Sequence, residues 1–307
     1  MNNGGVSISS GRRVLLPDYL AGAADVPVTY YRESAAEYPL DDVEVYVPPY
    51  MGGPEGLALM ARMPRLRMAQ LLTAGFENAL AHLPPTVTLC NAGGVHDAST
   101  AELAVGLTLA SLRGLDDFAR AMPISSWLDG RRVSLADRRV VVIGAGGVGR
   151  AIERRLLPFE TDVVLVGRTA RDGVHAVADL PGLLPGADVV VLAVPLDAST
   201  RGMVDARFLA SMRDGALLVN VARGPVVRTD DLLAEVERGR LRAALDVTDP
   251  EPLPADHPLW RLPGVLISPH VGGNTTAFLP RARRLVAEQL ARWEAGRSPL
   301  HIVAVGR

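Results

Sequence analysis

Short apolar runs alternate with helical patterns along most of the chain. In its first third, apolar runs predict strands at residues 14–16, 26–30, 43–47 and 67–72, and a helical pattern covers 55–63. Farther on, runs of the same kind predict six more strands, at 140–143, 162–166, 187–193, 216–221, 242–245 and 265–267. Helical patterns lie between most of them, as at 150–157, 205–212 and 230–237, and an amphipathic helix at 275–296 precedes a last candidate strand at 302–305. Strands that alternate with helices are typical of parallel α/β sheets.

The run Val140–Gly149 joins a buried strand, a glycine-rich turn and a helix. Gly144, Gly146 and Gly149 have the spacing G-x-G-x-x-G directly after four β-branched residues. The first glycine permits the turn, the second lets a pyrophosphate approach the backbone, and the third lets helix and strand pack closely. Phosphates would then lie at the helix N-terminus. Glycine-rich turns also serve as ordinary connectors, but the strand and helix on either side favour dinucleotide binding.

The length of 307 residues predicts two domains, each with its own core. We expect two Rossmann-like α/β domains with doubly wound parallel sheets. Residues 96–275 would form the dinucleotide-binding domain. Residues 1–95 would form a flavodoxin-like substrate domain, to which 276–307 return, and the binding cleft would lie between the domains.

Composition excludes several classes of protein. The chain is 48% apolar and 21% charged with a net charge of −2, which gives no reason to expect nucleic acid or an anionic membrane as partner. No apolar run approaches the ~18 residues of a membrane span. Met1–Ser10 is polar and glycine-rich, and we interpret it as a frayed tail rather than a signal peptide. The expected compartment is the cytoplasm.

The residue inventory also limits the chemistry. All 32 basic residues are arginine, so a Schiff-base lysine or a lysine general base is excluded. The single cysteine, Cys90, lies in a predicted buried strand and is interpreted as an inert core residue. The six histidines show no pair at metal-ligand spacing, so no metal site is expected.

Polar residues follow three of the later predicted strands. Arg223 comes after one strand, and arginine grips a planar carboxylate with two hydrogen bonds. Asp246 and Glu251 follow the next strand and His270 follows the last. A histidine held by a carboxylate is oriented for general acid–base catalysis near neutral pH. Taken singly, Arg223 could bind phosphate or face solvent, Glu251 could be a loop carboxylate and His270 a structural histidine. Their joint occurrence after a dinucleotide fingerprint favours a hydride-transfer site.

A second apolar segment suggests an interface. Asp97–Glu102 resembles a capping box that would open a helix from Ala101 to about Leu115. This helix is apolar around nearly its whole circumference, and Trp127 follows in a polar stretch. We expect a homodimer through this helix and the Trp127 segment. The alternatives are a helix buried within its own chain and a tryptophan that covers the local core.

The sequence resembles the D-isomer-specific 2-hydroxyacid dehydrogenases over about residues 66–273. The resemblance is carried by Thr100–Glu102, Gly144–Gly149, Thr200–Gly202, Asn220–Gly224, Asp246–Val247 with Glu251–Leu253, and Ser268–His270 with Gly273. It implies hydride transfer between NAD(P)H and a small 2-oxo acid or D-2-hydroxy acid. By this resemblance Arg223 holds the carboxylate and carbonyl of the substrate, His270 is the acid–base and Glu251 supports it. Two other members of the wider fold family stay open as alternatives: a formate- or phosphite-type dehydrogenase, and a nucleotide-sensing interaction protein of the corepressor type.

The same resemblance implies further binding residues. Asp246 would face the nicotinamide carboxamide, the backbone near Ala74 and Gly75 would bind the substrate carboxylate, and Tyr50 lies in a second loop expected to contact substrate. The other cofactor-binding residues would be Gly144, Gly146, Gly147, Val148, Gly149, Val194, Pro195, Thr200, Val221, Ala222 and Gly273.

The chain departs from the family pattern in two places. The family often has an acid after the second strand of this domain, where this chain has Arg168 and Thr169, as in the NADP-using glyoxylate and hydroxypyruvate reductases. Arg168 could pair with a 2′-phosphate, with Thr169 and Arg171 in support, so NADP is the expected cofactor. If Arg168 instead caps the strand in solvent, NAD would serve as well. The second departure is Arg228, to which we assign no role.

Overall fold

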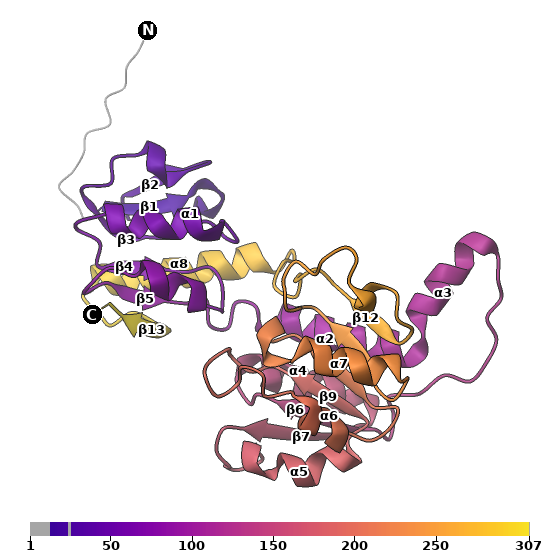
Figure 1. The fold of residues 1–307 in the computed structure, drawn as a ribbon. Helices are drawn as coiled ribbons and strands as arrows, with labels where there is room; N and C mark the ends of the chain where they lie inside the picture. The colour runs from indigo at the N-terminus through magenta and orange to yellow at the C-terminus, as the bar shows by residue number, and fades with distance from the viewer. Residues whose placement is uncertain (1–12, 24–25, 307) are drawn as a thin grey trace. The chain divides into compact units, whose positions relative to one another are not determined.

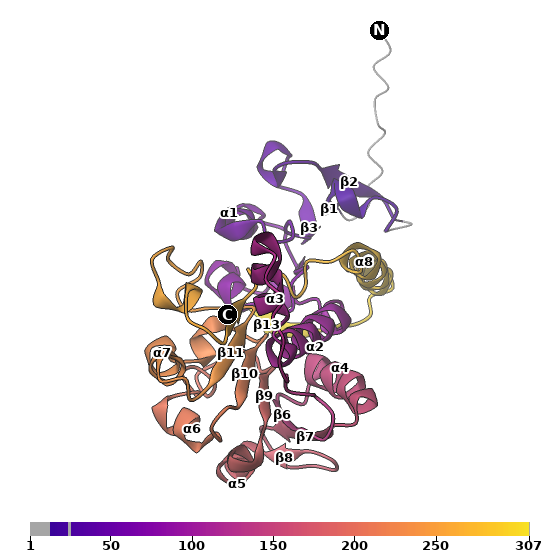
Figure 2. The same ribbon diagram turned by 90° about the vertical axis from the view of Figure 1, so that its right-hand side faces the viewer.

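The computed structural model describes residues 13–23 and 26–306, and the chain in it forms two compact units (Figures 1 and 2). Unit 1 comprises Met1–His96 and Thr276–Arg307, and unit 2 comprises Asp97–Thr275. The segment Met1–Ser10, interpreted above as a tail, lies outside the described residues.

Unit 1 is built on a six-stranded sheet with the order β13-β5-β4-β3-β1-β2. Five strands are parallel in the order 2-1-3-4-5, which is the flavodoxin-like order, and β13 pairs antiparallel with β5. The bounds are β1 Arg13–Pro17, β2 Val28–Tyr31, β3 Val43–Tyr46, β4 Met68–Gln70, β5 Thr88–Cys90 and β13 Ile302–Val305. The strand predicted at 26–30 therefore begins two residues later. The helix predicted over 55–63 divides into α1, Gly53–Ala58, and a 3₁₀ turn, Leu59–Arg62.

Both faces of this sheet are buried. Successive side chains of a strand point to opposite faces, so each strand contributes to two apolar clusters. In β1, Leu15 packs with the cluster that includes Leu57 of α1, whereas Val14 and Leu16 pack with the cluster beneath α8, Phe278–Glu294. Cys90 lies fully buried in the second cluster, and burial raises the pKa of its thiol to about 11. The prediction that Cys90 lies in a buried strand is confirmed.

Unit 2 contains a seven-stranded sheet with the order β12-β11-β10-β9-β6-β7-β8. All its pairings are parallel, and the order is that of doubly wound dinucleotide-binding sheets with one strand added at the end. The bounds are β6 Arg139–Ile143, β7 Asp162–Gly167, β8 His175–Ala176, β9 Val189–Leu192, β10 Leu217–Asn220, β11 Arg242–Leu245 and β12 Val265–Ile267. Six of these strands were predicted. The two-residue strand β8 was missed because it contains no apolar run.

Helices cover both faces of this sheet (Figure 2). One face carries α2, Asp97–Arg113, and α4, Gly147–Leu156. The other carries α5 Leu180–Leu183, α6 Ala206–Ser211 and α7 Thr229–Glu237. Because both faces are covered, the strands are continuous apolar runs, as the sequence pattern indicates.

Helix α2 corrects the predicted start and the predicted cap. It begins at Asp97 rather than Ala101, so the supposed capping box lies within the first turns. The Ser99 hydroxyl hydrogen-bonds the Thr275 hydroxyl at 2.8 Å and so joins the two ends of unit 2. The helix ends before Gly114, whose φ of +63° requires the left-handed region. Its apolar residues are buried in their own unit, which is the alternative left open above.

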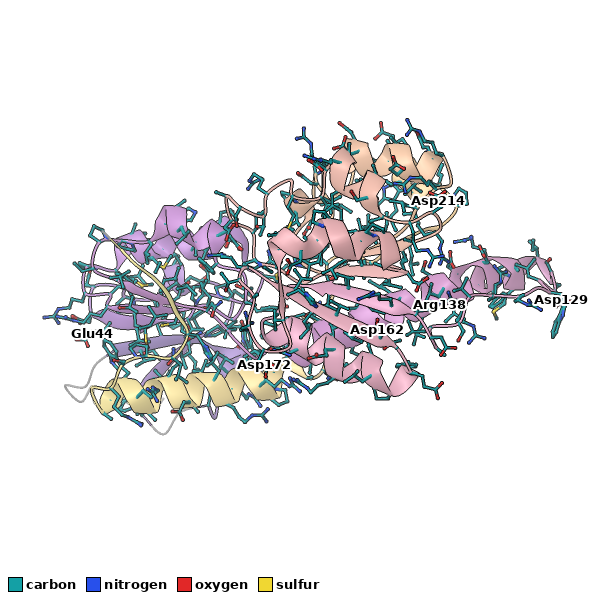
Figure 3. All side chains as sticks on the ribbon, turned by 90° about the horizontal axis from the view of Figure 1, so that it is seen from below. Glu44, Asp129, Arg138, Asp162, Asp172 and Asp214 are labelled. Atoms are coloured by element: carbon teal, nitrogen blue, oxygen red, sulfur yellow. The ribbon has the colours of Figure 1, made fainter. Side chains whose placement is uncertain are left out.

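Among the described residues, the most exposed large apolar side chains lie in the segment that follows, residues 114–133, which we name the arm. It contains α3, Leu115–Ala121, which projects from the rest of unit 2 in Figure 1, and Figure 3 shows Asp129 at its outer end. Met122, Ile124 and Trp127 are 77%, 75% and 93% exposed. Trp127 therefore does not cover the core of its own chain.

Candidate active site

His270 and Glu251 form a direct pair at the carboxyl edge of the unit 2 sheet. Glu251 follows β11, His270 follows β12, and the distance between His270 Nδ1 and Glu251 Oε1 is 2.6 Å. A carboxylate only accepts hydrogen bonds, so Nδ1 carries the donated proton. The other ring nitrogen, Nε2, is then the one that can exchange a proton with a ligand. His270 has a φ of +52°, and its N–H donates to the carbonyl of Asp246 at 2.8 Å.

Asp246 fixes the turn that carries His270. Its buried carboxylate accepts hydrogen bonds from the Ser268 hydroxyl at 2.7 Å and from the N–H groups of Val271 and Gly272, each at 2.9 Å. This arrangement places Asp246 between two strand ends and holds the backbone on both sides of His270. The sequence motif included Ser268, but nothing in the pattern revealed it as a partner of Asp246.

Arg223 follows β10 in a loop whose backbone is hydrogen-bonded by the Asn220 side chain. The Asn220 amide accepts from the N–H of Ala222 at 3.0 Å and donates to the carbonyl of Arg223 at 3.1 Å. Gly224 packs so closely on the carbonyl of Thr248 that any side chain there would collide with it. The Arg223 side chain is half-buried and donates to the Ala222 carbonyl at 2.7 Å. An asparagine buried within an apolar strand was the available sign of this loop-holding residue, and the sequence reasoning missed it.

The glycine turn after β6 has the geometry that a dinucleotide requires. Gly144 has a φ of +117° and packs against the carbonyl of Ala193, and Gly149 packs against the carbonyl of Gly144. A side chain at Gly146, in contrast, would meet no atom within 4 Å. The turn is therefore closed where helix and strand meet and open where a pyrophosphate would approach the N-terminus of α4. Gly147 packs against the carboxylate of Asp97, and Val148 is half-buried beside it.

The remaining predicted cofactor residues line loops at the same edge of the sheet. Val194, Pro195 and Thr200 follow β9, where the Thr200 hydroxyl donates to the Pro195 carbonyl at 2.7 Å. Val221 and Ala222 are buried directly after β10. Gly273 lies in the turn after β12, where its carbonyl accepts from the N–H of Thr275 at 3.1 Å.

Arg168 is largely exposed and pairs with an acid from another loop. It follows β7, and its Nη2 lies 3.0 Å from Oδ2 of Asp197, in the loop after β9. Thr169 is exposed beside it, and Arg171 Nη2 donates to the carbonyl of Ala145 within the glycine turn at 3.0 Å. Asp197 is a site residue that the sequence reasoning missed.

The predicted substrate residues of unit 1 lie in loops after β3 and β4. The ring of Tyr50 stacks on Phe278, with ring centroids 4.1 Å apart, and its N–H donates to the Tyr19 hydroxyl at 2.8 Å. The carbonyl of Ala74 accepts from the Asn91 side chain at 2.6 Å, and the carbonyl of Gly75 accepts from the Thr73 hydroxyl at 2.7 Å. The carbonyls of this loop are thereby turned toward their own unit.

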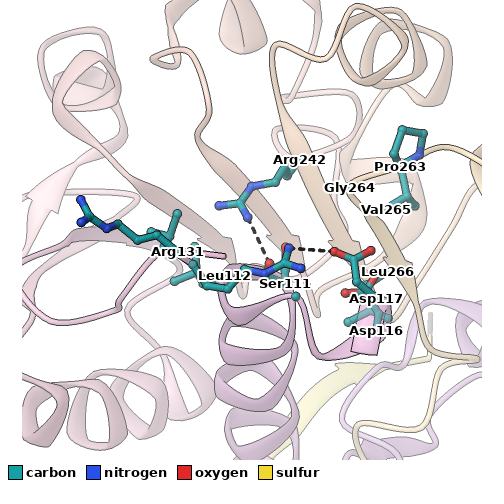
Figure 4. A pocket seen from close by; sticks show the side chains of 13 residues that line it. Ser111, Leu112, Asp116, Asp117, Arg131, Arg242, Pro263, Gly264, Val265 and Leu266 are labelled. Carbon is teal, nitrogen blue, oxygen red and sulfur yellow. Dashed lines mark hydrogen bonds and ion pairs between the residues drawn. The ribbon is translucent and has the colours of Figure 1, made fainter. Parts of the chain in front are cut away.

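Other features lie apart from this edge. Arg228 forms an exposed ion pair with Asp231 at 3.4 Å. A recess of about 300 Å³ lies at the amino ends of β11 and β12, where Arg242 donates to the Ser111 carbonyl at 3.0 Å (Figure 4). Among residues 13–23 and 26–306, no His, Cys, Asp and Glu side chains gather as a metal site. Within the same ranges, no helix combines the length and the apolar character that crossing a membrane requires.

Comparison with known proteins matches the site to one family. Residues 105–272 match the model of the D-isomer specific 2-hydroxyacid dehydrogenase NAD binding domain. The human glyoxylate reductase/hydroxypyruvate reductase is 36% identical over 189 residues, which are 58% of each chain. Glyoxylate/hydroxypyruvate reductase B of Citrobacter koseri is 31% identical over 71% of this chain and 72% of its own length. A D-isomer specific 2-hydroxyacid dehydrogenase from Xanthobacter autotrophicus Py2, solved with NADPH and MES, is 30% identical with a TM-score of 0.79, covering 95% of this chain and 98% of that one.

Proposed function

The chain belongs to the D-isomer-specific 2-hydroxyacid dehydrogenase family, and we propose that it reduces glyoxylate, hydroxypyruvate or a similar small 2-oxo acid to the D-2-hydroxy acid. It is an NAD(P)-dependent oxidoreductase that transfers a hydride between the cofactor and a small 2-oxo or 2-hydroxy acid. The names of the human and Citrobacter koseri relatives support the choice of substrates.

The observation that carries the proposal is the Glu251–His270 pair at 2.6 Å, at the same sheet edge as Arg223 and the glycine turn. General acid–base catalysis needs a positioned group that exchanges a proton. Hydride transfer to the carbonyl carbon also needs a cation that orients the 2-oxo acid. Both groups are present on loops held by Asp246 and Asn220. The open space over Gly146 fits the pyrophosphate of the cofactor.

Each residue then has a defined task. When bound, the nicotinamide supplies the hydride that adds to C2 of the oxo acid. Arg223 holds the substrate carboxylate with two hydrogen bonds and polarises the neighbouring carbonyl. His270 gives the proton from Nε2 to the carbonyl oxygen as it becomes a hydroxyl group, and Glu251 keeps the ring in place. Asp246 holds the turn of His270 through its buried carboxylate, and by the family resemblance it lies beside the nicotinamide carboxamide. The backbone near Ala74 and Gly75 also binds the substrate carboxylate, and the loop of Tyr50 contacts the rest of the substrate.

We assign NADP as the preferred cofactor, with NAD as a possible second. Arg168, Thr169 and Arg171 supply two cations and a hydroxyl group near the end of β7, where a 2′-phosphate is recognised in this fold. The Xanthobacter autotrophicus structure contains NADPH, which supports this choice.

The arm supports a second proposal, that two copies of the chain form a homodimer. Its exposed Met122, Ile124 and Trp127 form apolar surface that water does not favour, and tryptophan is enriched at contacts between proteins. Since α2 is buried in its own unit, the arm alone now carries this proposal. A cytoplasmic location, expected from the sequence, is also kept as a proposal.

A screen of 2-oxo acids tests the proposed function. The protein is mixed with NADPH and glyoxylate, hydroxypyruvate, phenylpyruvate or a branched 2-oxo acid, and the loss of NADPH absorbance is followed. We expect the fastest turnover with glyoxylate or hydroxypyruvate. Activity with only formate or phosphite and an oxidised cofactor would replace this proposal with the alternative dehydrogenase. Nucleotide binding without turnover, together with capture of a protein partner, would support the corepressor type.

A further inference from the structure

A carboxylate and a guanidinium meet where the 2′-phosphate of NADP would bind. Arg168 follows β7, Asp197 lies 29 residues farther on, and the two side chains form an ion pair of 3.0 Å. The site therefore contains an acid, although Arg168 and Thr169 stand directly after β7 where NAD-dependent relatives of this fold have one. The acid comes from the loop after β9 instead.

The carboxylate of Asp197 is fixed by its own loop. Its Oδ1 accepts from the N–H and the hydroxyl of Ser199, at 2.7 and 2.5 Å, and from the N–H of Thr200 at 3.2 Å. The Asp197 N–H in turn donates to the Thr200 hydroxyl at 2.8 Å. These contacts leave Oδ2 directed at Arg168. The hydrogen bonds from Ser199, above all, lower the pKa of Asp197, so the group stays ionised near neutral pH.

The charges around this point favour the phosphate less than the sequence suggests. Arg168 and Arg171 bring two positive charges, and the anchored Asp197 brings one negative charge. A phosphate beside Arg168 must share the guanidinium with Asp197 and is repelled by it. A ribose 2′-hydroxyl carries no charge and can donate a hydrogen bond to the same carboxylate. The acid thus opposes NADP and accommodates NAD.

We propose that Asp197 is a specificity-determining residue that weakens the preference for NADP and lets the enzyme use both cofactors. The proposal rests on the proposed function, because it assumes that the adenosine half of the cofactor binds beside β7. It assigns to the loop after β9 the role that an acid after β7 has in NAD-dependent relatives of this fold.

Binding of nucleotide fragments to the full-length protein tests the proposal without catalysis. Adenosine 2′,5′-bisphosphate carries the 2′-phosphate and 5′-AMP lacks it, and calorimetry gives the Kd of each. The variant Asp197→Asn keeps an oxygen for the N–H groups of Ser199 and Thr200 but removes the charge. We expect it to lower the Kd of the bisphosphate by about 3- to 10-fold and to change that of 5′-AMP by less than about 2-fold. The effect should shrink in 0.5 M salt, since exposed charges are screened.

Asp172→Asn is the matched control. Asp172 is an exposed acid near the same strand end and forms no ion pair within the described residues, so its loss changes the net charge equally. We expect little change in either Kd. An unchanged or raised Kd for the bisphosphate in Asp197→Asn, or an equal gain in Asp172→Asn, overturns the proposal. Wild-type protein that binds neither fragment overturns both this proposal and the proposed function, whereas binding that Asp197→Asn leaves unchanged overturns this one alone.

Discussion

The two sheets carry different kinds of groups at their carboxyl edges. In unit 2, charged side chains occupy that edge, and other side chains hold them: Glu251 holds His270, and Ser268 bonds the Asp246 carboxylate. In unit 1, the corresponding loops present Tyr50 in an aromatic stack and a backbone turn at Ala74. Charges held in place suit proton and hydride chemistry, whereas rings and backbone groups suit recognition of shape. We therefore propose that unit 2 carries out the reaction and that unit 1 selects the substrate.

The largest effect is expected from the centre of the unit 2 edge. Replacing His270 with Asn removes the proton donor but keeps a side chain of similar size. We expect turnover to fall by ~10²-fold or more, with nucleotide binding nearly unchanged. Steady-state kinetics and a cofactor titration measure the two quantities. Turnover near that of the wild type would remove His270 from the mechanism.

A smaller effect is expected at the phosphate end of the same unit. Arg168→Asp replaces a cation with a second acid beside Asp197, so a 2′-phosphate would meet two negative charges. We expect kcat/KM for NADPH to fall by ~10- to 100-fold and NADH to become the better cofactor. The same assay with both cofactors measures this order. If kcat/KM of the unmodified enzyme for NADH equals or exceeds that for NADPH at physiological salt, the role assigned to Arg168 is wrong.

In unit 1, a substitution of Tyr50 should weaken binding of the substrate and leave the reaction intact. Tyr50→Leu removes the ring that stacks on Phe278, while Tyr50→Phe keeps it. We expect Tyr50→Leu to raise the KM of the oxo acid by about 3- to 10-fold and to lower stability by about 1 kcal/mol, with the KM of NADPH unchanged. Loss of kcat without a change in substrate KM would show that unit 1 takes part in the chemistry.

The smallest effect on turnover is expected from the arm. Trp127→Ala removes the most exposed of its large apolar side chains and leaves both sheet edges intact. We expect turnover within about 2-fold of the wild type and a dimer that dissociates at higher protein concentration. Light scattering over a dilution series measures the mass. A single-chain mass for the wild-type protein at micromolar concentration would exclude the dimer.

The apolar runs in the sequence predicted most strands of both sheets. Strands that are buried on both faces consist of continuous apolar residues, so they can be recognised as such runs. Strand β8 escaped prediction because its two residues, His175 and Ala176, are placed by pairing with β7 rather than by burial. The start of α2 at Asp97 escaped for a related reason, since a polar first turn resembles a cap.

The site divides in the same way. Arg223, Glu251 and His270 could be named because each lies in the loop after an apolar run, and the structure brings Glu251 and His270 into contact. The contacts between loops could not be predicted. Ser268 and Asp246 are 22 residues apart in the sequence, and Arg168 and Asp197 are 29 apart. Contacts between loops of different strands arise from the order of the sheet, which the local pattern does not contain.

The transfer of a labelled hydride tests the assignment of the reaction to the unit 2 edge most directly. The wild-type enzyme and the His270→Asn variant are each incubated with hydroxypyruvate and NADPH in which both hydrogens at C4 of the nicotinamide are deuterium. We predict that the wild type forms D-glycerate with one deuterium at C2, and that the variant forms it ~10²-fold more slowly. Glycerate of the L configuration, product without deuterium at C2, or equal rates for the two proteins would contradict the assignment.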